Sequence, residues 1–178
     1  MQWLRLMRLR VVTTTAAADQ HVLALLAVPP GQPWTLRAAH ILTELGKTPG
    51  YLYLVLGFAV VDAGLALALT LLLVLSELVN AAIKHLVRRS RPLDCLSGPR
   101  AGLIEGRYSF PSCHAQNAAA IWGYLILTVG SLPAILGGLA FILAVGWARL
   151  RLGEHYLSDI IAGWIIGAAL ASLAHLMV

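Results

Sequence analysis

Three clusters of polar residues interrupt an otherwise apolar chain, and their types and spacings suit chemistry on an anion. In the first cluster, Lys84, Arg88 and Arg91 are spaced i, i+4 and i+7, so they share one face of a helix. Upstream, Glu77 and Asn80 extend this polar stripe. Taken alone, the cluster is equally explained as a basic cap that binds anionic lipid head groups.

The second cluster runs from Ser109 to His114 and opens an apolar segment. Pro111 suits the first turn of a helix, where a backbone N–H is unpaired in any case. The free N–H groups of such a turn, together with the helix dipole, form an anion site. Ser112 would add a hydroxyl donor and His114 a titratable proton. The alternative is a capped helix with an interfacial histidine.

The third cluster contains Arg149, His155 and Asp159. His155 and Asp159 are four residues apart, so the carboxylate can hold the imidazole by one ring nitrogen. The other nitrogen is then unprotonated, as a nucleophile or base requires. The pair could instead be a contact that stabilises a helix. Near a membrane, however, an ionisable pair indicates function.

Together the clusters supply what phosphoryl transfer needs: positive charge around the phosphate, a nucleophile in line and an acid for the leaving group. The cations would be Lys84, Arg91 and Arg149, and the two histidines would divide the other roles. The sequence contains no set of carboxylates with the spacing of a Mg²⁺ site.

The composition places these clusters in a membrane protein. Of the 178 residues, 59% are hydrophobic and 12% are charged, against about 25% charged residues in soluble domains. Thirteen Lys and Arg against eight Asp and Glu give a net charge of +5. This excludes a disordered chain, which needs low hydrophobicity and high charge, and it argues against a soluble nucleic-acid binder.

The two cysteines, Cys95 and Cys113, form no metal-binding spacing but could pair as a disulfide.

The apolar segments predict an all-α, polytopic membrane bundle of about five transmembrane helices with short interfacial helices at the N-terminus. We treat residues 1–178 as one domain, in which 1–47 form an amphipathic, interfacial segment and 48–178 the transmembrane catalytic core. The first residues predict an amphipathic helix lying on the membrane, and 20–46 predict two short surface helices. The expected spans are 49–62, 63–84, 112–129, 132–149 and 155–177.

Two consequences follow from these spans. Lys84, Ser112, Arg149 and His155 fall at span ends on the same membrane face, so the three clusters can converge at one shallow depth. In the last span, small residues recur every fourth position and predict a face for close helix packing. They are Gly163, Gly167 and Ala171.

The clusters resemble the signature of the type 2 phosphatidic acid phosphatase family, which is related to the vanadium haloperoxidases. The family pattern is K-x6-R-P, then P-S-G-H, then S-R-x5-H-x3-D. This chain has Lys84-x6-Arg91-Pro92, Pro111-Ser112-Cys113-His114 and Ala148-Arg149-x5-His155-x3-Asp159. The motifs cover residues 84–159, and the helices around them extend the likeness to about 50–178.

The resemblance implies a role for each matched residue. His155 would attack phosphorus to form a phosphohistidine, Asp159 would orient it, and His114 would protonate the leaving oxygen. Phosphate would be held by five residues, with backbone amides after Ser112 assisting: Lys84, Arg91, Ser112, Cys113 and Arg149. The resemblance implies no metal and no other cofactor.

The chain departs from the family pattern in three ways. Cys113 replaces the usual Gly, so a side chain stands where the backbone approaches phosphate. Ala148 replaces Ser, which removes a secondary hydrogen bond. Members usually have six spans, and the first one is missing from the five expected here.

The resemblance implies a metal-independent phosphatase for a membrane lipid phosphate or diphosphate. Candidate substrates are phosphatidic acid, phosphatidylglycerol phosphate and a polyprenyl diphosphate. Additional basic residues would favour a diphosphate or bind bulk anionic lipid: Arg88, Arg89, Arg100 and Arg107. The alternatives are a lipid phosphotransferase with the same chemistry, an inactive lipid-binding protein or, less favoured, a haloperoxidase. The expected partners are the lipid substrate and the bilayer, without nucleic acid; the oligomeric state stays open.

The orientation of the active-site face is contested by two arguments. If residues 1–47 do not span, all thirteen Lys and Arg lie on that face, which the positive-inside rule makes cytoplasmic. The resemblance points outward, since bacterial members mostly open to the outside, and three of the cations serve catalysis. We favour an outward-facing site in a prokaryotic plasma membrane.

Overall fold

The computed structural model describes residues 19, 21, 33–92 and 108–177. Within these residues every regular element is a helix, which confirms the all-α class. The helices are α3 (Pro33–Leu45), α4 (Thr48–Val61), α5 (Ala63–Val87), α8 (Cys113–Val129), α9 (Leu132–Arg151) and α10 (Leu157–Leu176). The expected amphipathic helix at the N-terminus, Cys95 with its possible disulfide, Arg100 and Arg107 lie outside the described residues. So does most of the segment in which a second surface helix was expected before α3.

Three of the described helices are long and apolar enough to cross a membrane: α5, α9 and α10. Helix α4 has 14 residues, about 21 Å at 1.5 Å per residue, against a hydrocarbon core of about 30 Å. Helix α8 has 17 residues, or about 26 Å. Five helices therefore form where five spans were expected, and membrane crossing by α4 and α8 stays a prediction.

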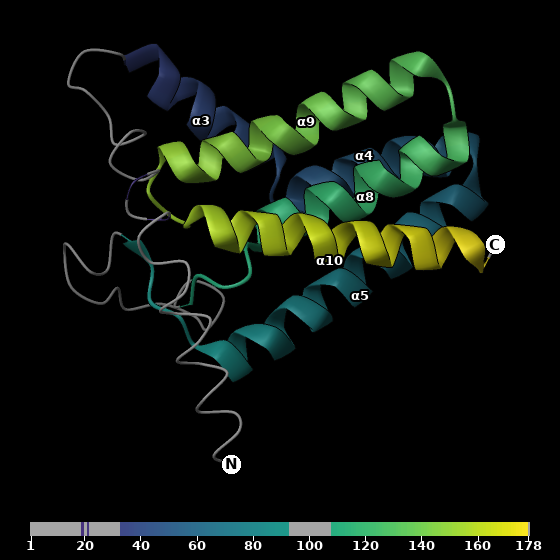
Figure 1. Cartoon of the computed structure of the whole chain (residues 1–178). Helices are drawn as coiled ribbons and strands as arrows, with labels where there is room; N and C mark the ends of the chain where they lie inside the picture. The colour runs from purple at the N-terminus through teal and green to yellow at the C-terminus, as the bar shows by residue number, and fades with distance from the viewer. Residues whose placement is uncertain (1–18, 20, 22–32, 93–107, 178) are drawn as a thin grey trace.

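Short turns at one end of the bundle reverse the chain between neighbouring helices. Asp62 caps α5 by accepting a hydrogen bond from Leu65 N at 2.9 Å. Gly130 ends α8 with a φ of 64°, a left-handed conformation that a residue without Cβ adopts at no steric cost. As a result, the last turns of α5 and α9 and the first turns of α8 and α10 lie at the opposite end of the bundle (Figure 1).

Helix α8 packs against α5, α9 and α10, and its contact with α10 depends on small residues. A Cβ added at Gly167 would lie 2.2 Å from the carbonyl oxygen of Gln116, and one at Gly163 would lie 2.7 Å from that of Ser112. Both distances are shorter than any real Cβ contact, so glycine is required at these positions. The predicted small-residue face is confirmed, and it brings the start of α10 against the start of α8.

Candidate active site

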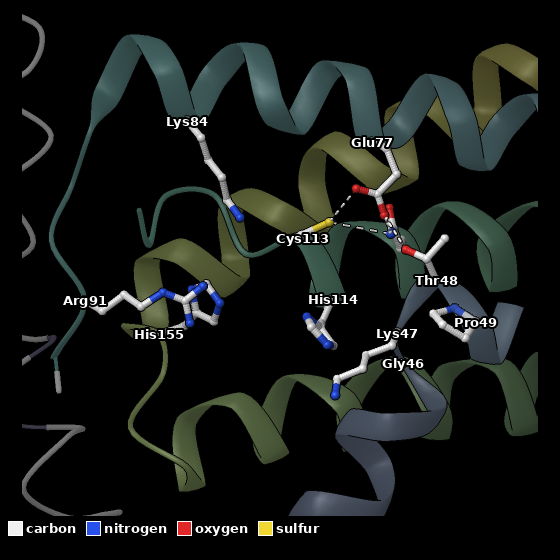
Figure 2. A pocket seen from close by; sticks show the side chains of 11 residues that line it. Gly46, Lys47, Thr48, Pro49, Glu77, Lys84, Arg91, Cys113, His114 and His155 are labelled. Carbon is white, nitrogen blue, oxygen red and sulfur yellow. Dashed lines mark hydrogen bonds between the residues drawn. The ribbon is translucent and has the colours of Figure 1, made fainter. Parts of the chain in front are cut away.

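A cavity of about 250 Å³ lies at the end of the bundle where the three polar clusters meet (Figure 2). Five of the residues predicted from the sequence line it, together with residues of the α3–α4 junction, α5 and α8. The lining residues are Gly46, Lys47, Thr48, Pro49, Glu77, Lys84, Arg91, Cys113, His114, Asn117 and His155. Each of the three clusters contributes at least one residue to the cavity. The predicted convergence of the clusters is therefore confirmed.

His155 lies in the segment just before α10, and its side chain is buried. Its Nδ1 atom is 2.8 Å from the backbone carbonyl oxygen of Ser109. A carbonyl oxygen can only accept a hydrogen bond, so Nδ1 carries the proton and donates it. The second nitrogen, Nε2, is then left with its lone pair, which is the form a nucleophilic imidazole needs.

The contact between His155 and Asp159 corrects one prediction. His155 Nδ1 lies 3.7 Å from Asp159 Oδ2, beyond hydrogen-bonding distance. The sequence predicted that the Asp159 carboxylate holds the imidazole by a direct hydrogen bond, and this prediction is wrong in this structure. The physical reason is that Asp159 already accepts from Arg89 Nη1 at 2.8 Å and from Tyr156 N at 2.9 Å. The Ser109 carbonyl therefore determines the tautomer of His155, and Asp159 lies near the ring without a hydrogen bond to it.

Arg89 joins the two residues that flank the imidazole. Its side chain is buried and pairs with Asp159 and, through Nη2, with Asp19 Oδ2 at 2.7 Å. Its backbone carbonyl accepts from Ser109 N at 2.8 Å.

The sequence suggested that Arg89 binds a diphosphate or bulk lipid, and the structure corrects this. Helix α5 ends at Val87 and Arg88 is its left-handed C-cap, so the helical face predicted for Lys84, Arg88 and Arg91 does not extend beyond Lys84. Arg89 lies past the helix end, and its guanidinium group is buried in the ion pairs with Asp19 and Asp159.

The segment that begins α10 is held by the same network. Ser158 N and Oγ donate to the two carboxylate oxygens of Asp19 at 3.0 and 2.7 Å. The guanidinium carbon of Arg89 lies 4.1 Å from the centroid of the Tyr156 ring, within the range of a cation–π contact. Asp19 thus connects a segment near the N-terminus to the residues that follow His155, a link with no signature in the sequence.

A carboxylate without a recognisable sequence motif lies between two predicted phosphate ligands. Glu154 pairs with Arg91, and its Oε2 atom is 3.8 Å from Arg149 Nη2. Arg149 also donates to Thr43 Oγ1 of α3 at 3.3 Å, and it lies beside the cavity, not among its lining residues. A phosphate that binds these two guanidinium groups must share them with Glu154 or displace it.

Several buried polar atoms beside the reacting end of the cavity have no hydrogen-bond partner among the described residues, and three of them bear on anion binding. They are Ser112 Oγ, His114 Nε2 and Arg149 Nε. Ser112 is the N-cap of α8, yet its hydroxyl makes no capping bond. Because the first N–H groups of a helix have no intrahelical acceptor, the start of α8 presents backbone and side-chain donors together. An anion bound there would satisfy them.

The electrostatics of the reacting end keep His155 neutral. Burial lowers the pKa of His155 well below its ordinary value of 6.5, and the positive charges of Arg149, Arg91 and Lys84 lower it further. Both causes disfavour the protonated imidazolium. A neutral imidazole surrounded by cations is suited to attack a phosphate that those cations hold.

The other end of the cavity contains a carboxylate held by donors. Glu77 Oε1 accepts from Thr48 Oγ1 at 2.9 Å and from Asn117 Nδ2 at 2.7 Å, and Glu77 Oε2 accepts from Cys113 Sγ at 3.2 Å. Cys113 therefore contributes a side-chain contact where the family pattern has glycine. Asn80, which shares the stripe with Glu77, instead donates to Gln116 Oε1 at 2.9 Å and joins α5 to α8.

Comparisons with known proteins agree with this geometry. Residues 64–178 match the family model described as the PAP2 superfamily. The chain is 28% identical over 158 residues to phosphatidylglycerophosphatase B of Bacillus subtilis (strain 168), covering 78% of this chain and 73% of that protein. It is 27% identical over 113 residues to an undecaprenyl-diphosphatase of Sulfolobus acidocaldarius, covering 62% and 53%. This second match spans about half of the relative's length.

A solved structure shares the fold. The crystal structure of a transmembrane PAP2 type phosphatidylglycerolphosphate phosphatase from Bacillus subtilis superimposes with a TM-score of 0.76. The superposition covers 98% of this chain and 93% of that one, at 24% sequence identity. At this identity the likeness supports the helical arrangement, and the chemistry follows from the residues of the cavity.

Replacing Arg89 tests the network that holds His155. Arg89→Gln would leave Asp19 and Asp159 buried without their cation, so we expect the free energy of unfolding to fall by about 3–5 kcal/mol. Arg88→Gln makes the same change in charge at the exposed neighbouring residue and should cost about 0.5 kcal/mol or less. Denaturant unfolding of both variants in detergent measures the difference; equal losses would contradict the assignment.

Proposed function

Because the chain belongs to the PAP2 superfamily and is a phosphoric ester hydrolase, we propose that it releases phosphate from a membrane lipid through a phosphohistidine. The observation that carries this proposal is the hydrogen bond from His155 Nδ1 to Ser109. It leaves Nε2 of a buried, neutral imidazole facing a cavity lined by Lys84 and Arg91.

The first step of the proposed reaction joins His155 to phosphorus. Nε2 attacks the terminal phosphorus, the bond between phosphorus and the lipid oxygen breaks, and His114, protonated when the anionic substrate is bound, gives its proton to that oxygen. The positive charge that develops on the imidazole is balanced by Asp159, 3.7 Å from Nδ1. In the second step water attacks the phosphohistidine and gives a proton to His114. Free phosphate leaves, and both histidines return to their starting forms.

Charge stabilisation in both steps is assigned to the protein itself. Lys84 and Arg91 line the cavity, and Arg149 lies beside it with a buried Nε atom that has no partner among the described residues. Preorganised cations of this kind stabilise the charge on the phosphoryl oxygens without rearranging. This arrangement supports a reaction that is independent of metal ions.

The substrate class follows from the surroundings of the cavity. Helices α5, α9 and α10 are apolar enough to lie in a bilayer, and the cavity opens among their polar ends. Its volume of about 250 Å³ is below the roughly 300 Å³ at which pockets for drug-sized ligands begin. A phosphorylated head group fits, while acyl or prenyl chains stay in the bilayer. Phosphatidic acid, phosphatidylglycerol phosphate and a polyprenyl diphosphate are the candidates, and the names of two relatives support the last two.

We place the site on the outer face of a prokaryotic plasma membrane. Five basic side chains at this end of the bundle are buried inside the protein, so they do not report orientation as exposed loop residues do under the positive-inside rule: Lys84, Arg89, Arg91, Arg149 and Arg151. With Cys113 replaced by Gly, Cys95 is the one cysteine left in the sequence, and it falls between the last residue of α5 and the first of α8. We expect a membrane-impermeant thiol reagent to label it in intact cells; labelling only after lysis would mean that the site is cytoplasmic.

The proposed function predicts phosphate release that depends on His155 and not on metal ions. Purified protein in detergent with EDTA should release inorganic phosphate from one or more of the three candidate lipids. His155→Ala should lower the rate by about a thousandfold or more, because it removes the nucleophile. His175→Ala, at the exposed far end of α10, is the matched control and should retain activity. Release that EDTA abolishes, or that survives in His155→Ala, would refute the mechanism.

A further inference from the structure

The cavity has two ends of opposite character. Lys84, Arg91 and His155 lie at one end, and Glu77 and Thr48 lie at the other (Figure 2). His114 and Cys113 lie between them in the same view. The proposed reaction uses residues of the cationic end and assigns no role to Glu77 or Thr48 at the carboxylate end.

Helix geometry places Glu77 on the path of the leaving group. Glu77 precedes Lys84 by seven residues on α5, which is two turns on the same face and about 10 Å along the axis. Lys84 is near the end of the helix, so Glu77 lies deeper toward the bilayer. Because the cavity continues from Lys84 and His155 to Glu77, a lipid bound at the cationic end can direct its head group along the cavity toward Glu77.

The side chains around Glu77 present hydrogen-bond donors to its carboxylate. Thr48, Asn117 and Cys113 all donate to it, which is the pattern that an acceptor-only, ionised carboxylate requires. Lys47, the cation at this end of the cavity, is paired with Glu44, so this pair adds no net charge. The negative charge of Glu77 therefore acts on whatever leaving group lies there.

The geometry points to a head-group subsite, formed by Glu77, Thr48 and Asn117, that accepts an uncharged, hydroxyl- or ester-bearing leaving group and rejects a second phosphate. This inference rests on the proposed function and names its substrate class: phosphate monoesters of lipids in preference to diphosphates. With phosphatidic acid, the phosphorus–oxygen bond breaks and neutral diacylglycerol departs with the proton of His114. With phosphatidylglycerol phosphate, the departing alcohol carries an anionic phosphodiester one glycerol unit away from the reacting phosphorus. With a diphosphate, the departing group is itself an anionic phosphate close to Glu77.

The discrimination is electrostatic. At the effective dielectric constant of about 20 that applies near a protein surface, two unit negative charges about 10 Å apart repel by slightly more than the energy of a tenfold rate difference. A neutral head group meets no such repulsion, and a hydroxyl on it can donate to the remaining lone pairs of the carboxylate.

A matched pair of lipids tests the subsite. Phosphatidic acid and diacylglycerol diphosphate can carry identical chains and differ by one phosphate. Glu77→Gln keeps the shape and removes the charge, so we expect it to raise the diphosphate-to-monoester ratio of kcat/KM at least tenfold over wild type. Asp62→Asn makes the same change at the far end of α5, where asparagine caps as well as aspartate, and should leave the ratio unchanged.

The outcomes separate this inference from the function on which it rests. Wild-type activity with the same ratio in Glu77→Gln would overturn the subsite and leave the phosphatase function standing. No release by wild type from either lipid would overturn the function, and the subsite with it.

A second measurement needs no variant and so does not depend on the folding of Glu77→Gln. We expect glycerol 3-phosphate to inhibit the wild-type protein at lower concentration than inorganic pyrophosphate does, although pyrophosphate carries more charge for Lys84 and Arg91. Tighter inhibition by pyrophosphate would overturn the subsite.

Discussion

The hydrogen bond from His155 Nδ1 to the carbonyl oxygen of Ser109 decides which imidazole nitrogen can act, and the surrounding structure serves to maintain it. The two residues are 46 positions apart in the chain, so the bond forms only when the segments before α8 and before α10 lie together. Ser109 is fixed by its own bond to the backbone of Arg89. The side chain of Arg89 in turn holds Asp159, which follows His155. One buried arginine thus secures the acceptor and the carboxylate on both sides of the imidazole.

Charge compensation and close packing explain how such a site forms at the end of an apolar bundle. Burying an arginine is costly unless a carboxylate pairs with it, and Asp19, Glu154 and Asp159 supply those partners. Glycines on α10 let its first turns approach α8, where Ser112 N donates to the carbonyl of Asp159 at 3.0 Å. The same approach leaves the Ser112 hydroxyl buried beside the cavity with no partner among the described residues. Polar groups that the protein does not satisfy itself are those that a substrate phosphate can satisfy.

The sequence alone predicted the helices and the convergence of the clusters because both depend on local signals. Apolar segments locate α5, α9 and α10, and turn residues such as Gly130 and Asp62 separate the helices. Motif spacing identified His155 and Lys84, since residue type and interval are enough to match a family pattern. Sequence did not identify Ser109 as the partner of His155, because any residue can supply a backbone carbonyl. It also missed the links from Arg89 to Asp19 and from Arg91 to Glu154, since long-range ion pairs depend on side-chain directions that no local pattern contains.

The central claim is that His155 carries the phosphate during turnover, and trapping the phosphoenzyme tests it most directly. Protein mixed with lipid labelled in its terminal phosphate would be quenched within milliseconds, digested and analysed by mass spectrometry. The account predicts an acid-labile, alkali-stable phosphate on the peptide that contains His155. Phosphate on His114, or turnover with no phosphorylated peptide, would contradict it.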